Sequence, residues 1–428
     1  MGENKPDNAQ KGQKELKHID FSSPLAHLAD VSKRLYTSCM NLIDVASTPQ
    51  LNVAIISYYF KKPCLSGVGI HAQNLAKFLV KNNCKVHVFC SGEEDGIYKE
   101  DGIIVHTIGK ILIPIADKYA QKRLEADIFE SEVVKEVVRE NAKQKFDIVH
   151  THGGITKAAF ILKKVYDTKW IHTFHAIEKL RVKEMSKVDK QFKDLITWVE
   201  STVNYCDGAI FVSKQLMKDA ENVYRIKSKT VIPNGVDLSL FEVTPITKKN
   251  VLFIGRFSKE KGIDLIPEVI LDVMTINDSS VTIVCPSKAL QNDLVPIQTH
   301  LHNLEKQFPG RVKIIEQTQT QEELRELYKE CQVYIQPSKY ESFGLCIVEA
   351  MATSRPVVAF KVGGIPEVIG DAGIMVKTPK ELITSVKELL KSREKCASLG
   401  KKAAERAKMF DWDVIAKKTI DYYKEVRK

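Results

Sequence analysis

The sequence predicts an α/β protein with two domains, each built on a parallel sheet covered by helices. Short apolar segments alternate with helical segments from residue 51 onward, and this alternation is typical of parallel strands that are joined through helices. A polar, turn-rich stretch at residues 235–249 interrupts the alternation and predicts the domain boundary. The 428 residues also exceed one ordinary hydrophobic core and fit two domains of about 150 to 200 residues.

The expected strands are short apolar runs bounded by turn residues. In the first domain they fall at residues 52–57, 85–90, 103–108, 147–151, 169–173, 208–212 and 230–232. In the second domain they fall at residues 251–255, 280–285, 312–315, 333–336, 357–360 and 374–376. Ligands of such sheets bind beyond the carboxyl ends of the strands. We therefore expect one cleft to contain the residues found at those ends, namely His150, His152, Gly153 and His175.

The chain is expected to have further segments outside the two domains. Residues 1–20 are polar and predict a disordered tail. Residues 21–50 predict a helical extension, because apolar residues recur three or four positions apart at Leu25, Leu28, Val31, Leu35, Cys39 and Leu42. The two domains occupy residues 51–240 and 241–409. Residues 410–428 predict a terminal helix, with Asp411 as its cap and Asp413 as an acid of its first turn.

Two carboxylates flank the start of a predicted helix in the second domain. Glu341 and Glu349 are separated by seven residues, and residues 342–345 follow the first of them after the strand at 333–336. A helix N-terminus binds anions through its unpaired amides and its dipole. A diphosphate could bind there while the carboxylates, which repel phosphate, accept hydrogen bonds from sugar hydroxyls.

Two other segments predict contacts with the same diphosphate. Arg256 and Lys261 lie in a loop after the strand at 251–255, and their side chains offer a planar fork and a compact charge that suit phosphate oxygens. Near the start of the first domain, Gly67 and Gly69 end a loop that leads into a helix expected at residues 70–80. Glycines allow the backbone to approach a ligand closely.

These motifs, in this order, resemble the retaining GT-B glycosyltransferases of family 4, and the resemblance covers roughly residues 51–428. The most specific element is Glu-x7-Glu with Phe-Gly-Leu between its acids. The resemblance implies two Rossmann-like domains that face each other across a cleft, with the terminal helix crossing back to the first domain. The resemblance also implies that Glu341 contacts the sugar hydroxyls and that Glu349 contacts the nucleotide ribose. Backbone amides of Phe343, Gly344 and Leu345 would contact the sugar or the phosphates. Arg256 and Lys261 would bind the diphosphate, and the glycine loop at Gly67 and Gly69 would face the phosphates.

The resemblance further implies an active-site histidine at the end of the strand at 169–173. His175 closes a Thr-Phe-His triplet and is our choice, while His172 is the competitor on the opposite side of the strand. Nucleobase contacts are expected near Pro286, where the family's usual glycine-rich turn is replaced by Cys-Pro-Ser. The preferred base stays open.

Composition narrows the class of protein and its partners. No apolar run approaches the length of a membrane span, the first 17 residues lack a secretory apolar core, and the nine cysteines show no metal or disulfide spacing. We therefore expect a cytoplasmic protein with reduced thiols. Residues 377–428 hold fifteen Lys and Arg against eight Asp and Glu, a net +7 of the total +10. This charge predicts either a solvated helix face or peripheral contact with an anionic membrane; nucleic acid is not expected, because no binding motif accompanies the charge.

The expected reaction is retaining transfer of a hexose from a nucleoside diphosphate sugar to a lipid-linked, polyol or saccharide hydroxyl, with no metal and no cofactor. The Asp-x-Asp at residues 411–413 and the histidines at 150, 152, 172 and 175 are not expected to bind metal, since a helix cap and strand ends explain them. A glycosidase is disfavoured because eight residues of continuous helix separate two carboxylates by about 12 Å. A nicotinamide dehydrogenase is disfavoured because Ala72 stands where a third glycine is expected. A non-catalytic sugar-nucleotide-binding subunit or sensor stays open.

Overall fold

The computed structural model describes residues 51–60, 66–110, 118–178, 180, 202–286 and 292–428. The predicted tail at residues 1–20 and the helical extension at residues 21–50 lie outside the described residues. Residues Leu51–Lys428 form one compact unit. Within the described ranges, no helix combines the length and the apolar character that a membrane crossing requires.

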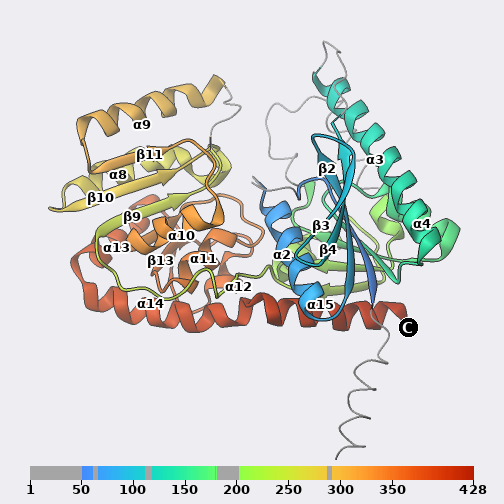
Figure 1. Cartoon of the computed structure of the whole chain (residues 1–428). Helices are drawn as coiled ribbons and strands as arrows, with labels where there is room; N and C mark the ends of the chain where they lie inside the picture. Colours follow the sequence, from blue (N-terminus) through green and yellow to red (C-terminus); the bar gives the residue numbers. More distant parts are fainter. Residues whose placement is uncertain (1–50, 61–65, 111–117, 179, 181–201, 287–291) are drawn as a thin grey trace, which may run out of the picture. The chain divides into compact units, whose positions relative to one another are not determined.

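The described residues form one eight-stranded sheet and one six-stranded sheet (Figure 1). The first sheet contains, in spatial order, β3 (Gly96–Glu100), β4 (Ile103–Gly109), β2 (Lys85–Gly92), β1 (Asn52–Ser57), β5 (Ile148–His152), β6 (Lys169–Phe174), β7 (Gly208–Phe211) and β8 (Ser228–Val231). The second contains β11 (Val312–Ile315), β10 (Ser279–Val284), β9 (Lys249–Ile254), β12 (Val333–Gln336), β13 (Val357–Phe360) and β14 (Ile374–Val376). The predicted fold class is confirmed.

Among the described residues, β3 is the one strand that was not predicted, and it pairs with β4 in antiparallel register. Its side chains are mostly exposed, so it lacks the apolar run by which the other strands were found. The sequence nevertheless contains a signal for a β-hairpin at this position. Asp101 and Gly102 connect the two strands with φ values of 51° and 81°, and an Asp-Gly pair is a strong hairpin signal because its turn requires positive φ at both positions. The described part of this sheet is therefore parallel except at one edge.

Helices follow most of the parallel strands. Those of the first half are α2 (Gly67–Lys81), α3 (Lys118–Lys143), α4 (Lys157–Tyr166) and α7 (Lys214–Glu221). Those of the second half are α8 (Ile266–Met274), α9 (Val295–Gln307), α10 (Gln321–Glu330), α11 (Leu345–Ala352), α12 (Ile365–Ile369), α13 (Pro379–Lys391) and α14 (Arg393–Ala407). The central strands β1 and β9 are fully or almost fully buried, as expected for strands covered on both faces.

The last helix, α15 (Trp412–Arg427), returns to the first half of the chain. Asp411 caps it by accepting a hydrogen bond from the amide of Asp413 at 3.0 Å, so the predicted cap is confirmed. Asp413 pairs with Lys81 of α2 at 2.7 Å. In Figure 1, α14 and α15 follow one another along the same side, with α15 beside the first sheet. The predicted crossing back to the first domain is confirmed.

A buried arginine anchors the connection between the two sheets to the second half. The side chain of Arg355 is fully buried, and its guanidinium donates to the carbonyl oxygens of Tyr328 at 2.7 Å, Lys329 at 3.0 Å and Thr244 at 2.8 Å. Thr244 belongs to the segment between β8 and β9, while Tyr328 and Lys329 lie in the last turn of α10. The guanidinium therefore ties the linker to carbonyl groups at the C-terminus of this helix.

Candidate functional site

The order of the strands creates a crevice in each sheet. In the first sheet β1 lies between β2 and β5, and in the second β9 lies between β10 and β12. These are the positions at which the strand order reverses, and ligands of α/β sheets bind beyond the carboxyl ends of the strands at such positions. A pocket of 1010 Å³ opens there, and residues from both halves of the chain line it.

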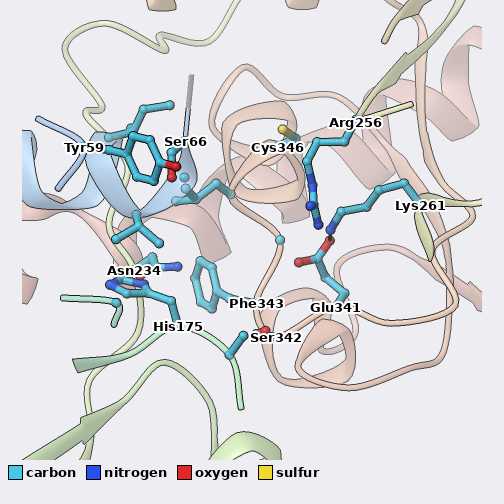
Figure 2. A pocket seen from close by; sticks show the side chains of 18 of the residues that line it. Tyr59, Ser66, His175, Asn234, Arg256, Lys261, Glu341, Ser342, Phe343 and Cys346 are labelled. Atoms are coloured by element: carbon cyan, nitrogen blue, oxygen red, sulfur yellow. Dashed lines mark hydrogen bonds and ion pairs between the residues drawn. The ribbon is translucent and has the colours of Figure 1, made fainter. Parts of the chain in front are cut away.

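Most of the predicted site residues lie on this pocket (Figure 2). The lining includes Gly67, His175, Arg256, Lys261, Pro286, Glu341, Phe343, Gly344, Leu345 and Glu349. Gly69 is not part of the lining and is buried in the first turn of α2. His150 and His152 are also absent from the lining, although Gly153 contributes to it. The expectation that all these strand ends face one cleft was wrong for the two histidines, whose side chains are buried at 0% and 1% exposure.

An ion pair between Lys261 and Glu341 lies on the side of the pocket formed by the second half of the chain. The ammonium of Lys261 lies 2.8 Å from a carboxylate oxygen of Glu341, and the two side chains are only 15% and 14% exposed. Lys261 ends a short 3-10 helix, Lys259–Lys261, after β9, and Glu341 follows β12. Partial burial strengthens such a pair relative to one at the surface, because water screens it less. In the absence of a ligand, the two charges therefore satisfy one another.

Arg256 is the more accessible cation of the site. Its guanidinium lies 3.1 Å from the carboxylate of Glu260, but the arginine side chain is 59% exposed. Figure 2 shows the side chains of Arg256 and Lys261 both extending toward Glu341. An exposed ion pair contributes little stability, so Arg256 can exchange its partner for a phosphate group at small cost.

Two helix N-termini meet at the pocket. Helix α11 begins at Leu345 with Gly344 in the cap position, and α2 begins at Gly67. A β-carbon added to Gly67 would lie 3.4 Å from Cδ1 of Leu345, so the two helix starts are close neighbours. Gly67 and Gly69 were predicted to lie in a loop before a helix at 70–80, but α2 begins three residues earlier, at Gly67. The glycines therefore present first-turn amides, which have no partner inside the helix.

Phe343 lines the pocket, and its side chain also packs into the protein core. Phe343 is 3% exposed, and its ring packs against the ring of Phe410, with centroids 5.6 Å apart. This contact belongs to a buried cluster that extends into both halves of the chain. The buried ring holds in place the turn that precedes α11, and thus the amides of that turn.

Glu349 is buried in the first turns of α11 and has a protein partner. The hydroxyl of Tyr328 lies 2.9 Å from its carboxylate, and burial raises the pKa of Glu349 to about 7. Glu341 lies before α11 begins, so the expected continuous helix between the two acids was wrong. The 12 Å separation derived from such a helix, which we used against a glycosidase, therefore falls away. The structure instead shows that Glu341 is held in an ion pair and that Glu349 is buried.

The raised pKa of Glu349 predicts a pH dependence of stability. The folded protein keeps this proton up to about pH 7, whereas the unfolded chain releases it near pH 4.5, so its stabilising contribution is complete below about pH 4.5 and is lost as the pH rises to about 7. Between pH 5 and 7, the free energy of unfolding should fall by about 2 kcal/mol more in the wild type than in Glu349→Gln. Urea unfolding at both pH values measures this difference.

The comparison has an internal control. Burial also raises the pKa of Glu130 to about 7, and this group contributes equally to the wild type and to Glu349→Gln. Equal slopes in the two proteins would show that the Glu349 carboxyl is ionised throughout this range.

Both competing histidines line the pocket, but in different settings. His172 lies within β6 and is bonded through Nδ1 to the hydroxyl of Thr151 at 2.8 Å. His175 follows the strand, which ends at Phe174, and its Nε2 lies 3.2 Å from Nδ1 of His152. Strand alternation therefore does not relate the two, and the choice of His175 stays a prediction. Burial lowers the pKa of both imidazoles.

Asn234 and His71 also lie in this region, although neither was predicted as a site residue. Asn234 lines the pocket, and its side-chain oxygen lies 2.8 Å from Nδ1 of His71 on α2. Asn234 was interpreted as part of a turn, and no motif singled out His71. One signal was available, because His71 lies four residues after Gly67 and therefore on the same face of the helix.

Comparison with known proteins agrees with this architecture. The model of the family described as Glycosyltransferase Family 4 matches residues 65–240, and that described as Glycosyl transferases group 1 matches residues 240–406. The alpha-maltose-1-phosphate synthase of Mycobacterium tuberculosis is 26% identical over 410 residues, which is 88% of this chain and 100% of that protein.

Two solved structures share the fold. The sucrose-phosphate synthase of Thermosynechococcus elongatus superposes with a TM-score of 0.72 at 21% identity, covering 88% of this chain and 99% of that one. HepE of Anabaena, solved in complex with UDP and glucose, superposes with a TM-score of 0.68 at 19% identity, covering 88% and 100%.

Two parallel-sheet domains with a shared pocket at their strand-order reversals define a GT-B protein. The two family models together match more than half of the residues. The chain belongs to the group 1, family 4 glycosyltransferases.

Proposed function

We propose that the chain transfers a hexose from a nucleoside diphosphate sugar to an acceptor hydroxyl, with retention of the anomeric configuration. The observation that carries the proposal is the meeting of two helix N-termini with Lys261 and Arg256 around one pocket. Amides and cations in this arrangement suit a diphosphate, and the acidic side chain of Glu341 beside them suits sugar hydroxyls.

Binding of the diphosphate changes the partners inside the pocket. Without a ligand, Lys261 and Glu341 neutralise each other at 2.8 Å. A diphosphate attracts the ammonium of Lys261 and the guanidinium of Arg256, and it leaves the carboxylate of Glu341 to accept hydrogen bonds from the sugar. Glu349 contributes a contact with the ribose, and residues near Pro286 contact the base. The ion pair thus keeps both groups in place before the donor arrives.

The chemical step needs stabilisation of the leaving group. As the glycosidic bond to the diphosphate breaks, negative charge develops on the phosphate oxygen and positive charge on the sugar ring. Fixed cations and amides stabilise that developing negative charge. The departing phosphate oxygen accepts the proton of the acceptor hydroxyl on the same face of the sugar, which accounts for retention. His175 contacts the sugar at the edge of the pocket, and the step requires no metal.

The acceptor belongs to one of three classes, a lipid-linked, polyol or saccharide hydroxyl. The excess of positive charge in residues 377–428 supports peripheral contact with an anionic membrane, which suits the first class. One related protein is named as a synthase of a sugar phosphate, which suits the third.

The decisive experiment measures nucleotide binding and product formation together. Calorimetry with UDP, GDP and ADP identifies the base, and NMR of the sugar product identifies the anomer formed from the matching donor. Arg256→Ala should weaken binding of the nucleoside diphosphate by about 2 kcal/mol, roughly 30-fold, because a charge-assisted contact is lost.

Lys259→Ala is the matched control for the arginine variant. Lys259 lies in the adjacent short helix, pairs with Asp293 at 2.7 Å and does not line the pocket, so its loss should leave binding unchanged. Equal weakening in both variants would indicate a general charge effect. Tight nucleotide binding without turnover of any donor would favour the alternative, a non-catalytic sugar-nucleotide-binding subunit.

A separate prediction concerns metal ions. The proposed mechanism places only protein cations and amides at the leaving group, so full transferase activity is expected in excess EDTA. Initial rates with and without the chelator measure this. Activity that EDTA removes and Mg²⁺ or Mn²⁺ restores would overturn the metal-free mechanism.

A further inference from the structure

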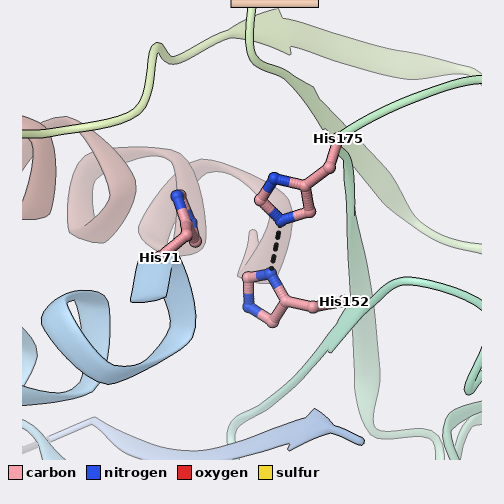
Figure 3. Close-up of side chains that lie close together, drawn as sticks. All are labelled: His71, His152 and His175. Carbon is pink, nitrogen blue, oxygen red and sulfur yellow. Dashed lines mark hydrogen bonds between the residues drawn. The ribbon is translucent and has the colours of Figure 1, made fainter. Parts of the chain in front are cut away.

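Three histidines from separate elements meet beside the pocket (Figure 3). His71 lies on α2, His152 ends β5, and His175 follows β6. One ring nitrogen from each lies within 4.8 Å of the others. His71 and His152 are buried, whereas His175 is partly exposed and reaches the pocket.

The spacing is close to that of a tetrahedral metal site. Zinc–nitrogen bonds of 2.0–2.1 Å in a tetrahedron place neighbouring nitrogens roughly 3.3 to 3.4 Å apart. Nδ1 of His152 and Nε2 of His175 lie 3.2 Å apart, so one edge of such a tetrahedron is already present. The third nitrogen lies within 4.8 Å of both, so it needs to move by at most about 1.5 Å to complete the face.

The protons of these rings are arranged so that lone pairs are available. A neutral imidazole has one N–H and one lone pair. Nδ1 of His71 is 2.8 Å from the side-chain oxygen of Asn234, which accepts that N–H and leaves the lone pair on Nε2. Such an outer hydrogen bond is the usual way in which proteins orient a metal-binding histidine.

The protein by itself does not satisfy the polar atoms of this cluster. His152 is 1% exposed, and its Nδ1 faces Nε2 of His175. The facing nitrogens of His152 and His175 can share only one proton. A metal ion in place of that proton would engage both lone pairs at once.

The neighbouring histidines already have partners. His150 contacts the hydroxyl of Tyr423 at 2.6 Å and that of Thr173 at 2.7 Å, and His172 contacts the hydroxyl of Thr151. These two rings therefore support the sheet, and the set of possible ligands is His71, His152 and His175.

We propose that these three imidazoles bind a divalent transition metal of the zinc class, with the fourth coordination position open to the pocket. A purely nitrogen site suits zinc, cobalt or copper, whereas Mg²⁺ and Ca²⁺ prefer oxygen ligands. Coordination occupies the ring of His175, so the metal acts as a reversible inhibitor of sugar transfer. The metal binding rests on the geometry of the rings, and the inhibition rests on the proposed function.

A second cluster in the described residues provides the comparison site. His87 and His106 lie 3.0 Å apart beside Glu140. The carboxylate of Glu140 is already paired with Lys143 at 2.7 Å and lies 3.7 Å from Arg139. A metal ion there would have to displace these cations, so we expect the cluster of His71 to bind in preference.

The test is a Co²⁺ titration of the full chain, because cobalt in a tetrahedral site absorbs strongly in the visible range. The expected result is one bound Co²⁺, displaced by Zn²⁺ and unaffected by Mg²⁺. The absorption should disappear in His71→Gln and persist in His106→Gln. Absence of the absorption in the wild type, or its loss only in His106→Gln, would overturn the proposal. Thermal unfolding checks that each variant folds, and His152→Gln replaces His71→Gln if the latter does not.

Inhibition is measured separately from binding. Zn²⁺ should lower the transfer rate at the concentration at which it displaces Co²⁺, and EDTA should restore the rate. Zinc that binds without lowering transfer would overturn the inhibitory role. A chain that binds cobalt as expected but turns over no donor would refute the proposed function while leaving the metal site standing.

Discussion

Glu341→Gln is expected to lower the rate of sugar transfer at least about 100-fold, because the carboxylate positions the hydroxyls of the donor sugar for reaction. The substitution keeps the size of the side chain and removes its charge. It also removes the partner that holds Lys261 at 2.8 Å in the free protein. Binding of the nucleoside diphosphate should change much less, since Lys261 becomes free for phosphate. Single-turnover rates and calorimetry separate the two effects.

A double-mutant cycle with Lys261→Met tests whether the two residues act together. Residues that share one interaction are not additive, so the double variant should be little slower than the slower single variant. Glu330→Gln is the matched control, because Glu330 pairs with Lys248 at 2.6 Å with both side chains more than half exposed. Near-normal transfer by Glu341→Gln would remove this residue from the site.

Gly363→Ala is expected to have the second large effect, on both stability and nucleotide binding. Gly363 has a φ of 51°, and a β-carbon there would lie 2.0 Å from the carbonyl oxygen of Glu341. That same oxygen accepts a hydrogen bond from the amide of Gly364 at 2.9 Å. An alanine must therefore displace the loop that carries Glu341. We expect a loss of about 3 kcal/mol or more in the free energy of unfolding and a large loss of donor binding.

Gly310→Ala separates the two causes of that loss. Gly310 has a φ of 73°, but a β-carbon there would meet nothing within 4 Å. Its substitution therefore costs only the strain of the left-handed conformation, about 1 to 2 kcal/mol, and should leave nucleotide binding intact. Similar losses of stability in the two variants, measured by urea unfolding, would show that the Glu341 loop adapts without cost.

Local patterns in the sequence identified most of the secondary structure and the positions of the motifs. Strand β1 is a run of buried residues, and Asp411 caps α15 through an amide two residues away. These features depend on neighbours a few positions apart, which the sequence displays directly. The hairpin of β3 also has a local sequence signal, the pair Asp101 and Gly102. It was not predicted because its strand is not apolar.

Pairs of side chains distant in the sequence could not be predicted in the same way. Lys261 meets Glu341 across 80 residues, and His71 meets Asn234 across 163. Such pairs depend on which strands become neighbours, since β1 lies beside β5 and β9 beside β12. The cluster of His71, His152 and His175 arises in the same way.

The sequence by itself thus determined the α/β class, the two-sheet organisation and the motifs whose function depends on adjacent residues. The tertiary structure alone decided which charges neutralise each other, which histidines support the sheet and which gather beside the pocket. The physical reason is how far apart along the chain the interacting residues lie. Helix hydrogen bonds, caps and periodic burial involve residues that are close together in the chain, whereas contacts between side chains far apart in the chain require the order and register of the strands to be known.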